Sequence, residues 1–294
     1  MPVRTVAIMS PGEMGHAVGR ALNWGGLGVI TCLKGRSKLS RKFADQGGIR
    51  DVPSLGEMLA EADLVLSIVP PGQALDNART VAEAMSASGH TPPYADCNAV
   101  SPATTRRIGE EIARAGADYI DGGIVGPPPG KGAPPRFYVS GARAGVMSEL
   151  DGMGIKIRAI GDEIGRASGL KMCYASLTKG TLALQTAVLT LAEALGLTEE
   201  LRDELLESRG AVYKQMESGI RRLPSVSARF IGEMEEIAAT YEAAGVTPKF
   251  HQGALDVYHL LASTPLAEET SETIDESRTL EEAARVFAAH LPMK

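Results

Sequence analysis

The sequence has few cysteines and no long uncharged apolar run. Cys32, Cys97 and Cys173 are widely spaced and form no Cys-x-x-Cys pair. This spacing is typical of a reducing compartment and argues against a disulfide framework or a zinc site. No segment approaches the roughly 20 apolar residues that cross a bilayer, and no signal-peptide pattern opens the chain. We therefore expect a cytoplasmic protein with no metal site and no membrane partner.

An excess of basic residues is also missing. The 294 residues include 30 Lys and Arg against 36 Asp and Glu, a net charge of −6, which argues against nucleic acid as a partner. Residues 1–160 hold 17 basic and 15 acidic side chains, whereas residues 161–294 hold 13 and 21. An anionic small molecule is therefore expected on the first part of the chain.

Hydrophobic patterning divides the chain near residue 160. Before this point, short apolar runs alternate with helical patterns, which predicts a parallel sheet with helical crossovers. The expected strands are Val6–Met9, Gly28–Leu33, Leu64–Val69, Tyr94–Cys97, Tyr119–Ile120, Phe137–Ser140 and Ile155–Ala159. The later expected helices are Leu170–Leu195, Glu199–Met216, Ser227–Ala244, Gly253–Leu261 and Thr279–His290. We predict an α/β fold, with a Rossmann domain of mostly parallel sheet (1–163) followed by an all-α domain (164–294).

The first strand leads into a glycine-containing turn that opens a helix. In such a turn, backbone N–H groups and the positive end of the helix dipole face a pyrophosphate. Ser10 stands where the first glycine of the usual G-x-G-x-x-G pattern belongs. A plain strand–turn–helix is the alternative. We predict dinucleotide binding by a set of four consecutive residues, Gly12, Glu13, Met14 and Gly15.

The end of the second expected strand bears on which dinucleotide binds. An NAD-binding protein usually has an acidic residue there for the ribose hydroxyls. Residues 33–38 instead read Leu-Lys-Gly-Arg-Ser-Lys, with three cations and no acid. Arg36 and Ser37 suit a 2′-phosphate, although an ordinary solvated basic loop has the same composition. We therefore predict NADP as the cofactor in preference to NAD.

Three further segments follow expected strands. Val69 and Pro70 end a buried strand, and Asn98 follows another, so all three are candidate cofactor contacts. A simple strand terminus and a local turn hydrogen bond are the respective alternatives. The glycine-rich segment 121–126 suggests backbone close to a ligand, and a flexible surface loop explains it equally well.

Lys171 lies in an apolar helical run. A lysine in this setting either reaches solvent past packed methylene groups or serves as a proton donor and acceptor. Lys179, two turns later, is expected to be an ordinary surface charge. His251 is a candidate pocket residue, and we expect it at the surface.

These segments together resemble the β-hydroxyacid dehydrogenase family, which includes 3-hydroxyisobutyrate and 6-phosphogluconate dehydrogenases. Residues 10–15 match the family's G-x-G-x-M-G signature except at Ser10. Residues 96–102 resemble its D-x-S-T-x-S-P segment, residues 121–126 its D-A-P-V-S-G segment, and the region around Lys171 its G-x-x-x-K-x-x-N-N helix. The last half of the chain resembles a branch with a phosphogluconate-dehydrogenase-like C-terminal domain.

The resemblance implies a nicotinamide-dependent oxidoreductase in which Lys171 is the general acid and base. It also implies a homodimer that packs through the helix Leu170–Leu195. The substrate-binding positions that it implies are Gly123, Val125, Tyr174 and Glu235. The substrate is expected to be a small molecule, a β-hydroxy acid or a related alcohol or carbonyl compound.

Departures from the family pattern affect the substrate site. Val125 replaces a serine, Tyr174 or Ala175 replaces an asparagine, and Glu235 replaces a lysine. Together they favour a substrate that is less acidic, bulkier or cationic. An imine reductase is one alternative, although such relatives generally lack the lysine. A dinucleotide-binding protein without turnover is the other.

Overall fold

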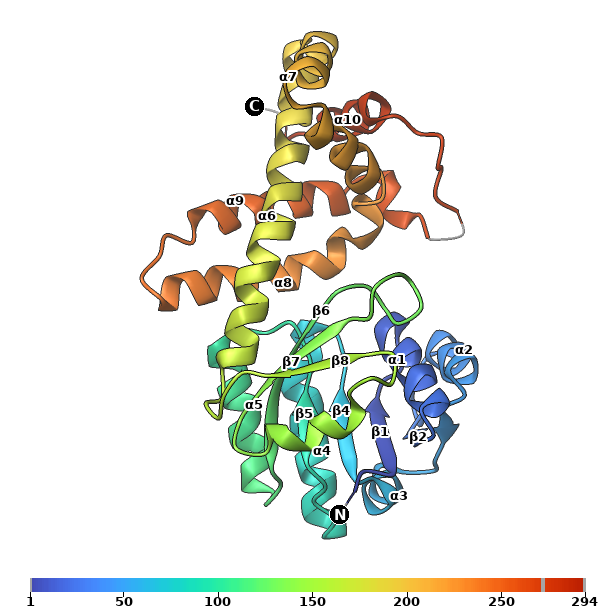
Figure 1. The fold of residues 1–294 in the computed structure, drawn as a ribbon. Helices are drawn as coiled ribbons and strands as arrows, with labels where there is room; N and C mark the ends of the chain where they lie inside the picture. Colours follow the sequence, from blue (N-terminus) through green and yellow to red (C-terminus); the bar gives the residue numbers. More distant parts are fainter. Residues whose placement is uncertain (1, 271–272, 293–294) are drawn as a thin grey trace. The chain divides into compact units, whose positions relative to one another are not determined.

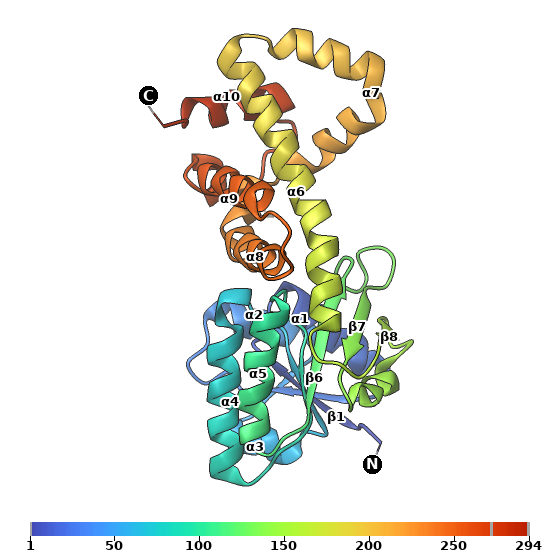
Figure 2. The ribbon, with the colours of Figure 1, turned by 90° about the vertical axis from the view of Figure 1, so that its left-hand side faces the viewer.

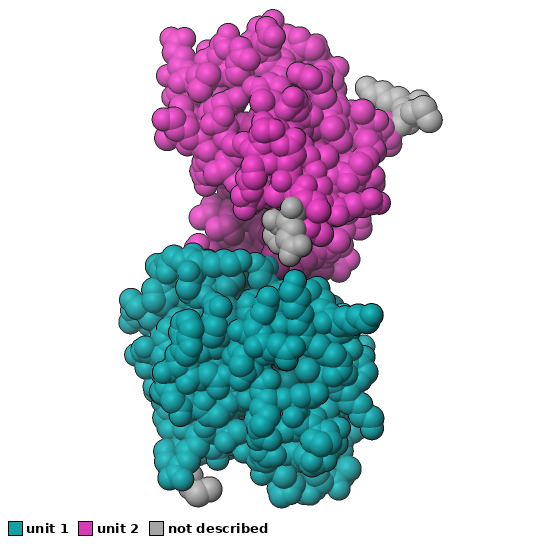
Figure 3. Space-filling view, turned by 90° about the vertical axis from the view of Figure 1, so that its right-hand side faces the viewer, with its two compact units in different colours: residues 1–173 teal, residues 174–294 magenta. Residues whose placement is uncertain are grey.

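The computed structural model describes residues 2–270 and 273–292. The chain forms two compact units, Met1–Cys173 and Tyr174–Lys294, shown in Figure 3. The units divide within helix α6 (Arg166–Leu195), whereas the sequence predicts a boundary immediately before this helix. The first two turns of α6 therefore belong to the first unit.

The first unit is built on an eight-stranded sheet with the strand order β3-β2-β1-β4-β5-β6-β7-β8. The strands are β1 (Thr5–Met9), β2 (Gly28–Thr31), β3 (Arg50–Asp51), β4 (Leu64–Ser67), β5 (Tyr94–Asp96), β6 (Tyr119–Val125), β7 (Arg136–Ser140) and β8 (Lys156–Ala159). All neighbours pair in parallel except β6 and β7, which are antiparallel. The mostly parallel Rossmann sheet predicted from the sequence is confirmed.

Helices cover both faces of this sheet because successive strand residues point to opposite sides. Val6 and Ile8 pack toward α1 (Glu13–Trp24), α2 (Lys38–Gly47) and the 3-10 helix η2 (Ala144–Leu150). Ala7 and Met9 pack toward α3 (Leu55–Glu61), α4 (Ala74–Ser88) and α5 (Pro102–Arg114). Figures 1 and 2 show the two helical layers. The short elements β3 and α3 have no counterpart among the sequence-based predictions.

The second unit is helical. It contains the rest of α6, α7 (Thr198–Ile220), α8 (Pro224–Ala243), α9 (Lys249–Ala262), the 3-10 turn η3 (Pro265–Glu268) and α10 (Leu280–Ala289). The 3-10 turn η1 (Pro71–Gln73) belongs to the first unit. Helices α8 and α9 lie side by side in Figures 1 and 2. The predicted all-α second half is confirmed. Within residues 2–270 and 273–292, no helix combines the length and apolar character needed to cross a bilayer.

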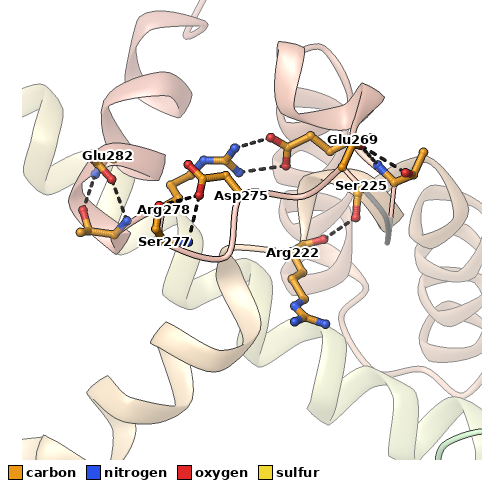
Figure 4. Close-up of polar contacts among 10 residues, drawn as sticks. Arg222, Ser225, Glu269, Asp275, Ser277, Arg278 and Glu282 are labelled. Carbon is orange, nitrogen blue, oxygen red and sulfur yellow. Dashed lines mark hydrogen bonds and ion pairs between the residues drawn. The ribbon is translucent and has the colours of Figure 1, made fainter.

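Polar contacts fix the start of α10. Arg278 is buried and binds both carboxylate oxygens of Glu269, one of them at 3.0 Å. Thr279 then caps the helix, because its hydroxyl accepts from the Glu282 amide at 3.1 Å and the Glu282 carboxylate accepts from the Thr279 amide at 2.8 Å. Figure 4 shows these contacts. A reciprocal pair of this kind satisfies amides that would otherwise lack a partner.

Candidate active site

The turn between β1 and α1 has the geometry of a dinucleotide-binding turn. Ser10 adopts a left-handed φ of 55°, the conformation that glycine supplies in the usual pattern. A Cβ at Gly12 would meet only the Ser10 carbonyl oxygen, at 4.0 Å, so this backbone faces open space. A Cβ at Gly15 would lie 3.4 Å from Ile8, so this glycine serves close packing of helix on strand. No side chain among the described residues caps α1, which suits an anion at its N-terminus.

The other two predicted residues of this turn differ in role. Met14 packs against the core. Glu13 begins α1, and its carboxylate pairs at 2.9 Å with Lys131 from the proline-rich loop between β6 and β7. Because the pair is exposed, it contributes little to stability. It places the Lys131 ammonium beside the first residue of α1.

The loop after β2 carries the predicted NADP determinants. Gly35 has a φ of 73° in a tight turn, and Arg36 follows it as a half-buried side chain. Ser37 caps α2, since its hydroxyl accepts from the Ser40 amide at 3.2 Å. An acidic residue does lie beside the end of β2, but it comes from the neighbouring strand β3. The carboxylate of Asp51 accepts from the Leu33 amide at 2.8 Å.

The ends of β4 and β5 are tied together by Asn98. Its side-chain oxygen accepts from the Val69 amide at 2.6 Å, and its amide group donates to the Ser67 hydroxyl at 3.0 Å and to Asp96. Asn98 is 3% exposed. The structure thus uses Asn98 to hold the strand ends, the local role that the sequence left as an alternative. Pro70 is exposed and leads into the 3-10 turn.

Asp96 and Asp121 place two buried carboxyl groups in register on β5 and β6. Burial, together with the nearby charge of Asp121, raises the pKa of Asp96 to about 8. The sequence did not predict that these two carboxyl groups lie close together, because their proximity depends on the pairing of β5 with β6.

Asp121 holds the start of α6. Its carboxylate accepts from the backbone amides of Gly165, Ala167 and Ser168 at 2.8, 3.0 and 3.2 Å. It also accepts from the hydroxyls of Ser168 at 2.5 Å and Ser140 at 2.9 Å. Asp121 is fully buried, so this carboxylate acts as the cap of α6 from a neighbouring strand.

Lys171 lies on the next turn of α6 and reaches back to β6. Its ammonium donates to the Ile124 carbonyl at 2.8 Å, and the side chain is half-buried. A Cβ at Gly123 would lie 2.8 Å from the Lys171 Cβ, so this glycine is required by the packing of α6. Val125 is 2% exposed. The structure therefore brings together Gly123, Val125 and Lys171 from the predicted set.

The remaining predicted substrate residues belong to the second unit. Tyr174 is 44% exposed, and Glu235 lies exposed on α8. Two expectations for this unit are wrong. Lys179 is buried in an ion pair with Glu233 of α8, and His251 is 7% exposed and packs against the Tyr241 ring. Both burials depend on helix packing that local sequence patterns do not reveal.

Comparison with known proteins places this geometry in a family. Residues 5–153, more than half of the chain, match the NAD-binding domain of 6-phosphogluconate dehydrogenase. The chain belongs to this family. Residues 192–261 match a second domain family, whose function is unknown. The predicted class, an NAD(P)-binding dehydrogenase, is confirmed, whereas the choice of dinucleotide, the substrate and the role of Lys171 stay predictions.

Relatives of this chain support the same grouping. An uncharacterised 28.5 kDa protein of Methanothermus fervidus is 32% identical over 185 residues, 63% of this chain and 70% of the relative. A conserved protein of unknown function, described as structurally similar to 3-hydroxyacid dehydrogenases, is 29% identical with a TM-score of 0.65, covering 87% of this chain and 96% of the other. The 3-hydroxyisobutyrate dehydrogenase of Mycobacterium tuberculosis shares the fold at 21% identity and a TM-score of 0.66, covering 96% and 99%.

We expect Asp121→Ala to destabilise the first unit by about 3–5 kcal/mol, because several buried donors would lose their acceptor. Denaturant titration measures this change. Asp118→Ala is the matched control, since it removes an exposed ion pair with Arg143 and should cost less than about 1 kcal/mol. Equal losses in the two variants would contradict the capping role of Asp121.

Proposed function

We propose that this protein is an NADP-dependent oxidoreductase that interconverts a 3-hydroxy acid, or a related alcohol, with the corresponding carbonyl compound. The observation that carries the proposal is the contact between the Lys171 ammonium and the Ile124 carbonyl. This contact lies near the carboxyl end of β6, and dinucleotides bind at the carboxyl ends of the strands in open α/β sheets. A titratable amine is therefore available at the carboxyl ends of the strands, where the family binds its cofactor.

Lys171 is the proposed general acid and base. The nicotinamide, when bound, supplies the hydride chemistry. During oxidation, the neutral amine of Lys171 takes the proton from the substrate hydroxyl, and during reduction the ammonium gives this proton to the forming alkoxide. The Ile124 carbonyl and the close packing on Gly123 restrict the directions that the lysine side chain can take. A positioned amine of this kind lowers the barrier to proton transfer.

The proposed preference for NADP rests on the loop after β2. This loop carries Lys34, Arg36 and Lys38, and Arg36 follows directly on the turn at Gly35. The one acid at the strand end, Asp51, faces the Arg41 guanidinium at 3.6 Å. The local charge therefore remains positive, which favours a 2′-phosphate over a bare ribose hydroxyl.

We also propose a homodimer that packs through α6. Exposed apolar side chains recur along this helix three, four or seven residues apart, in register with the heptad repeat that defines a coiled-coil seam. They are Tyr174, Leu177, Leu184, Val188, Leu191 and Leu195. Leu184 is 66% exposed and Leu191 is 59% exposed. A seam with this repeat is complementary to a second copy of itself, which makes another α6 its best occupant.

Replacing Lys171 by alanine should lower kcat/KM by about 10²- to 10⁴-fold, with NADPH affinity within about twofold of wild type because the β1–α1 turn is untouched. Steady-state rates with 3-hydroxy acids, aldehydes and a cyclic imine provide the measurement. Lys171→Arg keeps the charge but does not release its proton, so it should be nearly as slow. Full activity in Lys171→Ala would exclude the proposed mechanism.

Replacing Arg36 by alanine should raise the Kd for NADPH by about tenfold or more, since a charge-assisted contact to phosphate is lost. The Kd for NADH should change by less than about twofold, and it serves as the internal control. Fluorescence titration of both cofactors gives the two constants. A wild-type preference for NADH, or equal losses for both cofactors, would remove Arg36 from 2′-phosphate recognition.

The double variant Leu184→Glu, Leu191→Glu should convert the dimer into monomers, because like charges would face one another across the seam. Analytical ultracentrifugation reports the mass. Leu39→Glu is the matched control, since Leu39 is 57% exposed on α2, outside the seam. A dimer that survives the double substitution must use another surface.

A further inference from the structure

One side of β6 faces α6. Asp121 binds the amides at the start of α6, and a Cβ at Gly123 would touch Lys171. Val125 lies two residues further along the strand and so shares this side. The side of β6 that carries Val125 is therefore also the side of the proposed acid–base lysine.

The antiparallel partner β7 adds three polar residues to the same side. Its Ser140, Tyr138 and Arg136 stand opposite Asp121, Gly123 and Val125. Side chains that stand directly opposite each other in a sheet share a face. The contact between Ser140 and Asp121 at 2.9 Å verifies this assignment at one end of the pairing, while Phe137 and Val139 pack into the core on the other side.

The register consequently places Arg136 opposite the residue that follows the carbonyl bound by the Lys171 ammonium. The ammonium contacts the carbonyl of residue 124, between the pair Gly123–Tyr138 and the pair Val125–Arg136. Arg136 is half-buried. No carboxylate within residues 2–270 or 273–292 forms an ion pair with its guanidinium.

Two further cations increase the local positive charge. Lys156 of β8 pairs in register with Arg136, and Arg158 of the same strand pairs with Tyr138. Like charges side by side on neighbouring strands are destabilising. Cations on the edge strand β8 are explained by protection against edge pairing, but β7 is an inner strand. The unpaired guanidinium of Arg136 requires a different explanation.

We propose that Arg136 binds the carboxylate of the substrate. A guanidinium can form two parallel hydrogen bonds to a carboxylate. Arg136 stands directly opposite Val125, the residue that replaces a serine of the family pattern. The carboxylate contact thus moves from β6 to β7, and the substrate is an anion rather than the less acidic molecule expected from the sequence. This proposal rests on the proposed function, because it assumes that substrate meets Lys171.

Binding of 3-hydroxybutyrate tests the proposal without turnover. Calorimetry on the full chain saturated with NADPH gives the Kd, since two reduced molecules do not react. Arg136→Met should raise this Kd by about 10- to 100-fold. Arg136→Lys should raise it by less, because the ammonium keeps the positive charge although it lacks the paired geometry. The Kd for 1,3-butanediol, which lacks the carboxylate, should stay within about twofold, as should that for NADPH.

Lys156→Met is the matched control, because it removes a cation from the same face one strand further out. It should raise the Kd for 3-hydroxybutyrate by less than about threefold. Equal losses in Lys156→Met and Arg136→Met, or wild-type affinity in Arg136→Met, would overturn the proposal. It also fails if the wild-type protein binds 1,3-butanediol as well as 3-hydroxybutyrate or binds neither. Since this assay involves no proton transfer, its result is independent of whether Lys171 is catalytic.

Discussion

The carboxylate of Asp121 fixes the helix that carries Lys171. A buried charge is costly unless hydrogen bonds replace its lost hydration, and Asp121 receives them from three backbone amides and from nearby hydroxyls. The donors at the start of α6 also carry the positive end of the helix dipole. The cap and the helix therefore stabilise each other, and Lys171, one turn later, is held against the same strand.

Glycines on β6 make this arrangement sterically feasible. A Cβ at Gly122 would lie 2.8 Å from the Asp96 carbonyl oxygen, and one at Gly123 would lie 3.0 Å from the Ala167 carbonyl oxygen. At these two residues the strand is packed against β5 and α6, with no room for a side chain. The glycine-rich sequence that suggested a ligand is thus explained by close packing within the protein itself.

Features set by neighbouring residues could be predicted from the sequence. The turn at Gly12, the start of α5 at Ser101-Pro102 and the long helix that ends at Leu195 all depend on local chemistry. Features set by distant partners could not. The burial of Lys179 depends on Glu233, and the placement of Arg136 depends on an antiparallel register across a proline-rich loop. Hydrophobic patterns do not encode such pairings.

Three cations of low exposure, Lys179, Arg278 and Arg136, differ in their partners. Lys179 and Arg278 are buried, and each is neutralised by a carboxylate of its own unit, Glu233 and Glu269. Arg136 is half-buried, so water hydrates its guanidinium when no anion is present, and its cost to folding is small. Exclusion of that water by a bound carboxylate would strengthen the attraction, because charges interact more strongly at low dielectric. A cation of this kind contributes to recognition more than to the stability of the fold.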